Sequence, residues 1–153
     1  MGAEPRVEEK LTGDALARAC ADAMWAGDRA SQGLGMEIVD VGVGRATLRM
    51  TIRDDMVNGL DIGHGGLVFT LADSAFAFAC NSHNQHAVAQ HCAISFLGPA
   101  RKGDVLTAEA REVNRSGRSG IYDIRVTRAD GEVIAEFRGH SRTVKGTHLP
   151  VAD

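Results

Sequence analysis

Residues 65–82 constrain the fold more than any other segment, because they are apolar on nearly every face of a helix. Their sequence is GGLVFTLADSAFAFACNS, in which Ala and Gly are frequent. A helix that is hydrophobic all round is buried by its neighbours on all sides, and its small residues allow strands to pack closely around it. The segment therefore predicts one long central helix enclosed by a layer of other elements.

Strand-forming segments on both sides of this helix supply the enclosing layer. Alternating residues joined by a glycine-containing turn predict a hairpin, and turn residues separate the segments that follow the helix. The predicted strands are 36–41, 45–52, 87–98, 104–115, 119–129 and 132–144. This pattern favours an α+β fold in which an antiparallel β-sheet wraps around a long central α-helix.

The segment before the hairpin predicts a second helix. Apolar residues recur at helical spacing within residues 14–30, and Asp14 is a candidate N-cap. Both ends of the chain lie outside the predicted elements. The expected organisation is a loose N-terminal segment 1–13, a single domain 14–145 and a loose C-terminal tail 146–153.

The composition excludes several classes of protein. The 153 residues are 44% hydrophobic and 24% charged, which is enough apolar material for one core and too little charge for a disordered chain. The net charge of −3 predicts neither a nucleic acid nor a membrane as a partner. The first residues lack the apolar stretch of a signal peptide, and three cysteines, an odd count, predict free thiols. We therefore expect a cytoplasmic protein.

Asp73 is the residue that fits its surroundings least, because it is a carboxylate inside the apolar helix. Burying a carboxylate is costly unless the group is paired, protonated or engaged in chemistry. No Lys, Arg or His lies three or four residues away to neutralise it. Two interpretations stay open: Asp73 takes part in chemistry, or it is a structural residue hydrogen-bonded to Thr70, to Ser74 or to another strand.

The sequence His64-Gly65-Gly66 leads into the same helix. A helix N-terminus presents unpaired N–H groups and a partial positive charge, and glycine lets a ligand approach the backbone closely. Such a site can polarise a carbonyl oxygen and stabilise a developing oxyanion. The alternative is a glycine-rich helix start with no further role. Asn58, six residues before His64, is another polar candidate in this region.

Together these residues resemble the signature of a known family. The stretch MVNGLDIGHGGLVFTLADSAFAFACNS, residues 56–82, is similar to that of the PaaI-type thioesterases, which are hotdog-fold acyl-CoA thioesterases of phenylacetate degradation. The shared pattern is Asn-Gly, then His-Gly-Gly, then Phe and Leu-Ala-Asp on one helix, and the likeness extends over roughly 14–145. Residues 60–63 depart from it: they read Leu-Asp-Ile-Gly where the family often has His-Gly-Ile-Cys. This departure bears on the acyl preference more than on the reaction.

The resemblance implies a role for each residue of the pattern. The Gly65 N–H would bind the thioester carbonyl oxygen, with Gly66 beside it at the substrate. Asp73 would act as the nucleophile or as a general base on water. Asn58 would position the water or the thioester, and His64 would hold the loop or bond near the carbonyl. No metal or redox cofactor is implied, since coenzyme A is part of the substrate.

The positive charge is concentrated in the second part of the chain. Residues 89–153 carry 10 basic and 8 acidic side chains, a net +2, whereas residues 1–88 carry 7 and 12, a net −5. The resemblance implies that this region holds the coenzyme A tail, and that Arg111, Arg115 and Arg118 contact its phosphates. The alternative is a set of exposed strand arginines without a ligand.

A second group of candidates has a simpler interpretation. Cys80, His83, His86 and His91 lie close in sequence but match no standard zinc spacing, so we expect no metal site. Cys92 is expected to be a small core residue.

The resulting hypothesis is an enzyme that hydrolyses an acyl-CoA thioester, with aryl-acetyl groups such as phenylacetyl as the favoured class. One alternative is a non-catalytic acyl-CoA-binding protein, against which Asp73 argues. The other is a hotdog hydratase or dehydratase, whose motifs are not found here.

The spacing of two candidate residues bears on assembly. Gly65 and Asp73 are eight residues apart, which is about 12 Å along a helix axis. One chain therefore cannot easily place both groups at the same thioester. We expect a homodimer with shared active sites, paired again into a homotetramer, since a small sheet around one helix also leaves its edges open.

Overall fold

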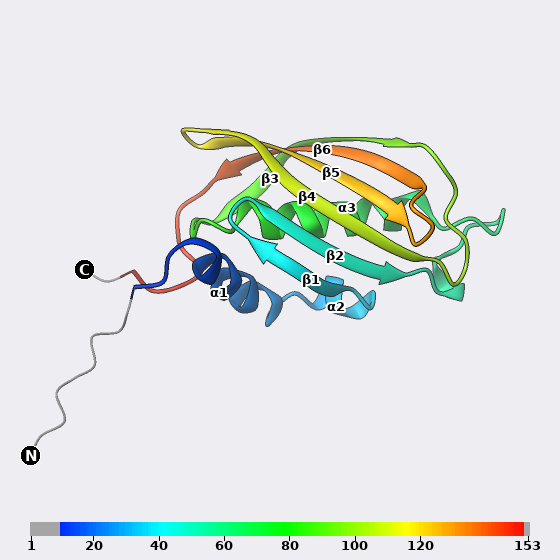
Figure 1. The fold of residues 1–153 in the computed structure, drawn as a ribbon, viewed down its shortest axis with the longest axis horizontal. Helices are drawn as coiled ribbons and strands as arrows, with labels where there is room; N and C mark the ends of the chain where they lie inside the picture. Colours follow the sequence, from blue (N-terminus) through cyan, green and yellow to red (C-terminus); the bar gives the residue numbers. More distant parts are fainter. Residues whose placement is uncertain (1–9, 152–153) are drawn as a thin grey trace, which may run out of the picture.

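The computed structural model describes residues 10–151, which form a six-stranded antiparallel sheet wrapped around one long helix (Figure 1). The strand order is β1-β2-β4-β5-β6-β3. The strands are β1 (Glu37–Gly42), β2 (Arg45–Thr51), β3 (Ala87–Phe96), β4 (Val105–Ser116), β5 (Ser119–Arg128) and β6 (Val133–Thr143). The helices are α1 (Gly13–Trp25), α2 (Arg29–Gly33) and α3 (Gly65–Cys80), with a 3₁₀ turn at Asp54–Met56. No helix in this described part of the chain combines the length and the apolar character needed to cross a membrane.

The predicted central helix and all six predicted strands are confirmed, with ends within a few residues of those expected. α3 packs across the inner face of the sheet, mainly against β2, β4 and β5. Alternate residues of these strands face it and are fully buried, among them Leu48, Leu106 and Ile124. The apolar helix and the inward-facing alternate residues of the strands thus form one core.

Gly139 of β6 allows a close approach between α3 and the sheet. A Cβ atom built on Gly139 would lie 2.7 Å from Cζ of Phe76. The Phe76 ring is buried and packs against Tyr122 and Phe137, with ring centroids 5.6 and 6.0 Å apart. The missing side chain at residue 139 therefore fixes how closely the central helix lies against the sheet.

The single helix predicted at 14–30 is wrong, because the structure has two helices there. α1 ends at Trp25 and α2 begins at Arg29. Asp28 starts the second helix, since its carboxylate accepts the Ser31 N–H at 2.9 Å and the Ser31 hydroxyl at 2.7 Å. An N-cap of this kind satisfies a backbone donor at the first turn of a new helix.

The predicted cap of α1 is also wrong. The N-cap is Thr12, whose side chain makes no capping hydrogen bond. Asp14 instead accepts the Val43 N–H at 2.9 Å and pairs with Arg45 at 3.1 Å. Its carboxylate therefore ties α1 to the β1–β2 turn rather than to its own helix.

Residues 146–149 are held against the end of α3, unlike the loose tail expected there. The Asn84 Oδ1 atom accepts the backbone N–H groups of His148 and Leu149, at 3.0 and 2.9 Å. His148 Nε2 also lies 2.7 Å from Asn81 Oδ1. Most of the predicted loose segment 1–13 lies outside the described residues.

β3 forms one edge of the sheet, and its outer side is unpaired within residues 10–151. Val88 and Phe96 on this strand are 51% and 54% exposed, and Leu97 directly after it is 60% exposed. An open edge that carries apolar side chains is a template for pairing with another strand. Of the two edge strands, β3 contacts α3 more extensively than β1, which packs against α1, so a second chain paired with β3 would lie close to the central helix.

We expect Gly139→Ala to destabilise the protein, because the added Cβ would overlap the buried Phe76 ring. Overpacking a core costs about 1–3 kcal/mol of unfolding free energy. Urea unfolding at one fixed protein concentration measures the change. Gly33→Ala is the matched control, since a Cβ there meets no atom within 4 Å and the midpoint should not fall. Equal midpoints for Gly139→Ala and the wild type would contradict the close approach.

Candidate active site

The loop before α3 is shaped by Asn58. Its Oδ1 atom accepts the backbone N–H groups of Leu60 and Ile62, at 2.9 and 3.2 Å, and its own N–H donates to the Ile62 carbonyl at 2.8 Å. Asp61 closes the turn with a φ of 56°, and Leu60 at the tip is 77% exposed. The Asn58 side-chain amide nitrogen has no hydrogen bond among the described residues. It is therefore left as a donor beside the helix start.

His64 is the N-cap of α3. Its Nδ1 atom accepts the Gly66 N–H at 3.0 Å, and its backbone N–H donates to the Met56 carbonyl at 2.8 Å. A ring nitrogen that accepts carries no proton, so a neutral His64 ring carries its proton on Nε2. The Gly66 N–H, predicted to face the substrate, is thus used within the chain. The Gly65 N–H bonds to no described residue and is a free donor at the positive end of the helix.

Asp73 lies about two turns further along α3 and is half-buried. The local structural alternatives are not found. Thr70 Oγ1 donates to the Gly66 carbonyl at 2.8 Å, and Ser74 Oγ bonds to Ser31 Oγ at 2.8 Å. Within residues 10–151, Asp73 has neither a hydrogen bond nor an ion pair. Burial alone raises the pKa of Asp73 above the usual range of an aspartate.

The surroundings of Asp73 place it beside the edge strand. Burial raises the pKa of the Cys80 thiol to about 12 and also raises the pKa of Cys92, and the nearby Asp73 charge adds to both shifts. Cys92 lies on the inner side of β3, opposite Gly139 of β6. The Asp73 carboxylate is therefore close enough to Cys92 of the edge strand for its charge to act on that thiol.

The free N–H and the unpaired carboxylate have complementary chemistry. A helix N–H at Gly65 is suited to a carbonyl oxygen that gains negative charge. A carboxylate whose pKa is raised, such as Asp73, is suited to take a proton from water near neutral pH. Within one chain the two groups stand at different heights on α3, about 12 Å apart along its axis. One chain therefore does not bring these two groups together at one point.

The three predicted arginines lie in two places. Arg111 is on the outer face of the sheet, away from α3, with Nη2 3.4 Å from Asp123 Oδ2. Arg115 and Arg118 lie at the β4–β5 turn, where they line a groove together with Lys145. We call these three cations the basic groove. Lys145 was not among the residues expected from the sequence to bind coenzyme A. It does contribute to the positive charge of residues 89–153, which could have indicated it.

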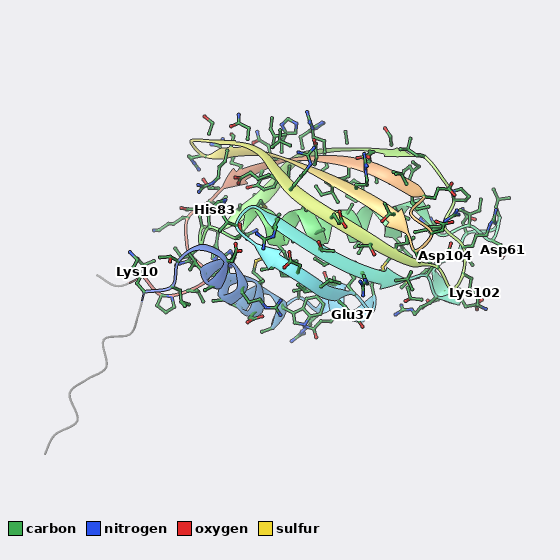
Figure 2. The ribbon with its side chains drawn as sticks, viewed as in Figure 1. Lys10, Glu37, Asp61, His83, Lys102 and Asp104 are labelled. Atoms are coloured by element: carbon green, nitrogen blue, oxygen red, sulfur yellow. The ribbon has the colours of Figure 1, made fainter. Side chains whose placement is uncertain are left out.

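The basic groove lies at the far end of α3 from Gly65. Gln85, a few residues after the helix ends, also lines it. Figure 2 shows the same separation: His83 lies at one end of the molecule and Asp61, in the loop before α3, at the other. One chain therefore does not bring its own basic groove to its own helix start.

The histidines that are close in sequence have separate partners. His83 Nε2 lies 2.9 Å from Glu112 Oε1. The ring pairs are His86 with His148 at 4.5 Å and His91 with His140 at 5.5 Å between centroids. Across residues 10–151, no three His, Cys, Asp or Glu side chains come together as a metal site would require.

Comparison with known proteins gives consistent matches. Residues 61–135 match the family model of the thioesterase superfamily. The chain is 42% identical over 127 residues to acyl-coenzyme A thioesterase PaaI of Escherichia coli (strain K12), which covers 83% of this chain and 91% of that protein. It is 34% identical over 118 residues to a putative esterase of Archaeoglobus fulgidus, covering 77% of each.

The solved structures agree with these matches. The structure of the E. coli PaaI protein from the phenylacetic acid degradation operon superposes with a TM-score of 0.85 at 41% identity, covering 86% of this chain and 96% of that chain. The predicted hotdog fold is thereby confirmed. The range matched by the family model includes His64, Gly65 and Asp73, whereas Asn58 lies just before it.

We expect Asp73→Asn to be at least as stable as the wild type at neutral pH. Burial raises the folded-state pKa of Asp73, so the folded protein loses stability relative to the unfolded chain as the pH rises through that pKa and the group ionises. Asparagine has a similar shape and never ionises. Urea unfolding should show an advantage of the variant at neutral pH that shrinks at acidic pH, where wild-type Asp73 is protonated.

Asp61→Asn is the control for this measurement. It makes the same chemical change at an exposed position, and asparagine tolerates its positive φ. Its stability difference from the wild type should stay small at both pH values. A clear loss of stability for Asp73→Asn at neutral pH would mean that an ionised Asp73 has a stabilising partner.

Proposed function

The chain belongs to the PaaI-type thioesterases of the hotdog-fold superfamily, and from this premise we propose that it hydrolyses acyl-CoA thioesters to a free acid and coenzyme A. The observation that carries the proposal is the free Gly65 N–H at the start of α3, together with the unpaired Asp73 carboxylate on the same helix. The similarity to acyl-coenzyme A thioesterase PaaI supports the class of reaction. No metal or redox cofactor is part of the proposal, in which water is the second substrate and protein groups supply the chemistry.

The Gly65 N–H binds the thioester carbonyl oxygen and stabilises the negative charge that develops on it. As a general base, Asp73 takes a proton from water while the hydroxide oxygen bonds to the carbonyl carbon. The C–S bond then breaks, and the thiolate of coenzyme A takes up the proton that Asp73 removed from water. As a nucleophile, Asp73 would instead bond to the carbonyl carbon, and the C–S bond would break with release of the coenzyme A thiolate. Water would then cleave the resulting anhydride, which releases the free acid and restores Asp73.

The other two predicted residues act around this pair. His64 caps the helix through Nδ1, which fixes the position of the Gly65 N–H and leaves the Nε2 proton available near the carbonyl. Asn58 holds the preceding loop through Oδ1, and its amide nitrogen is free to orient the water or the thioester.

Each complete site takes residues from two chains. Gly65, His64 and Asn58 come from one subunit, and Asp73 comes from its partner. Pairing of the open β3 edges around a two-fold axis would run the two α3 helices in opposite directions, which brings the start of one helix near the middle of the other. The unpaired edge of β3 and the exposed Val88 on it support a homodimer, and association of two dimers into a homotetramer extends the proposal.

The same antiparallel arrangement places the basic groove. The groove lies at the end of α3 farthest from Gly65 in its own chain, so the partner's groove lies near the helix start. There it would contact the phosphates of coenzyme A, while Arg111 on the outer face contributes less.

The acyl group and the location complete the proposal. Aryl-acetyl groups are the favoured class, supported by the likeness to a structure from the phenylacetic acid degradation operon. The unpaired thiols of Cys20, Cys80 and Cys92 in the described structure support a cytoplasmic location. The unpaired Asp73 carboxylate argues against the alternative of a protein that binds acyl-CoA without hydrolysing it.

The two-chain site is tested by mixing two inactive variants. Asp73→Asn should lower kcat by about a hundredfold or more, since it removes the base or nucleophile. Gly65→Pro removes the N–H at the first helical position, where proline is tolerated, and should be similarly inactive. A mixed dimer has one site with both defects and one site with neither. Random reassociation makes about half of the dimers mixed, so activity should recover to about a quarter of the wild type.

Gly65→Ala is the control for the proline variant. Both substitutions add a Cβ near the Phe96 ring, 3.1 Å from its Cζ, but only alanine keeps the N–H. Alanine should therefore retain much more activity than proline. Mixed dimers verified by mass that stay as inactive as their parents would show that both groups act from one chain.

Coenzyme A binding is tested by removing charge from the basic groove. Arg115→Ala with Arg118→Ala should raise KM roughly threefold to tenfold and leave kcat nearly unchanged, because the contacts are remote from the bond that breaks. Added salt should weaken the wild-type enzyme more with full acyl-CoA than with an acyl-pantetheine that lacks the nucleotide. Arg111→Ala, beside Asp123 on the outer face, is the matched comparison and should change KM less. Equal salt sensitivity of both substrates would contradict the contact.

A further inference from the structure

Phe96 lies directly over the start of α3. It is the last residue of β3, and its register opposite Ala135 places its side chain on the inner face of the sheet. A Cβ built on Gly65 would lie 3.1 Å from Cζ and 3.3 Å from Cε1 of the Phe96 ring. The ring therefore touches the helix turn whose free N–H is the proposed donor to the thioester carbonyl.

The exposure of this ring sets it apart from the other aromatic residues on the inner face. Phe76, Tyr122 and Phe137 are buried and pack against one another. Phe96 is 54% exposed and stacks on no aromatic ring within the described chain. A large apolar side chain gains substantially when it is covered, so an exposed ring at this position is suited to contact a bound group.

Two further apolar side chains lie on the elements that meet at Phe96. Phe69 lies one turn after Gly65 on α3, and Ile94 lies two residues before Phe96 on the same face of β3. Both are partly exposed and pack against the core. A hydrocarbon fits this surface better than the amides of a pantetheine arm, which would lose their hydrogen bonds to water there.

We propose that Phe96 is a specificity-determining residue that forms the wall of the acyl site and favours acyl groups with an aromatic ring. The proposal rests on the thioesterase function argued above. A carbonyl oxygen bound by the Gly65 N–H brings the first atoms of the acyl chain within reach of the Phe96 ring. The ring of an aryl-acetyl group can then pack against it edge to face or offset, as aromatic pairs prefer.

The test compares two substrates of similar size, phenylacetyl-CoA and cyclohexylacetyl-CoA, of which only the first has an aromatic acyl ring. The measured quantity is the ratio of their kcat/KM values. Phe96→Leu should lower this ratio by roughly twofold to tenfold, which is the worth of one aromatic pair. Phe96→Tyr keeps the ring and should keep the ratio. Leu97→Ala removes an exposed apolar side chain next to it in sequence and should also leave the ratio unchanged.

Oligomeric mass and unfolding midpoint are measured for each variant, and Phe96→Met serves as a second substitution if Phe96→Leu does not fold. An unchanged ratio in a folded, active Phe96→Leu or Phe96→Met enzyme would overturn the proposal. If both kcat/KM values fell equally, so that the ratio stayed the same, Phe96 would belong to the pantetheine or to the subunit contact instead. A wild-type enzyme that hydrolyses neither substrate nor any other acyl-CoA would contradict the thioesterase function itself, which is a distinguishable result.

Discussion

Burial of α3 against the inner face of the sheet is the interaction on which the rest of the structure depends. The helix is too apolar to face water, so the strands must wrap it. Gly139 sets the depth at which it lies, because the Phe76 ring fills the space that a side chain there would occupy. The same packing leaves one side of the helix next to the open edge of β3, and on that side lies Asp73. One face of α3 thus contributes to the core, and another contributes to the candidate site.

At the start of α3, the preceding loop and the helix cap leave one backbone N–H without a hydrogen-bond partner. Asn58 satisfies the backbone of its own loop, and His64 takes the Gly66 N–H. With these groups paired, the Gly65 N–H is left unpaired at the point where the helix dipole is strongest. A helix N-terminus has several backbone N–H groups without partners inside the helix. This cap pairs one of them and leaves another free to bind a ligand. The Phe96 ring then borders that donor on the side of the edge strand.

Much of the fold could be predicted from the sequence, because a long run that is apolar all round indicates a buried helix and alternating segments indicate strands. The break between α1 and α2 could not, since it depends on Asp28 bonding to Ser31, a contact that competes with a helical pattern continuing past it. The attachment of residues 146–149 depends on Asn84, far away in sequence. In the site, the sequence indicated Asp73 as a carboxylate inside an apolar helix, and His64 as the residue before the two glycines that begin that helix. It gave no sign of Phe96, whose position over Gly65 arises only when β3 joins the sheet edge.

The open edge of β3 also has a consequence for control of the enzyme in the cell. In the two-chain site proposed above, an isolated chain holds two incomplete halves. Specific activity then follows the fraction of chains that have associated, which rises with their concentration by mass action. Newly made chains at low abundance would leave the thioester pool untouched, and hydrolysis would switch on as the protein accumulates. The concentration of the protein would thereby set its specific activity, without any separate effector.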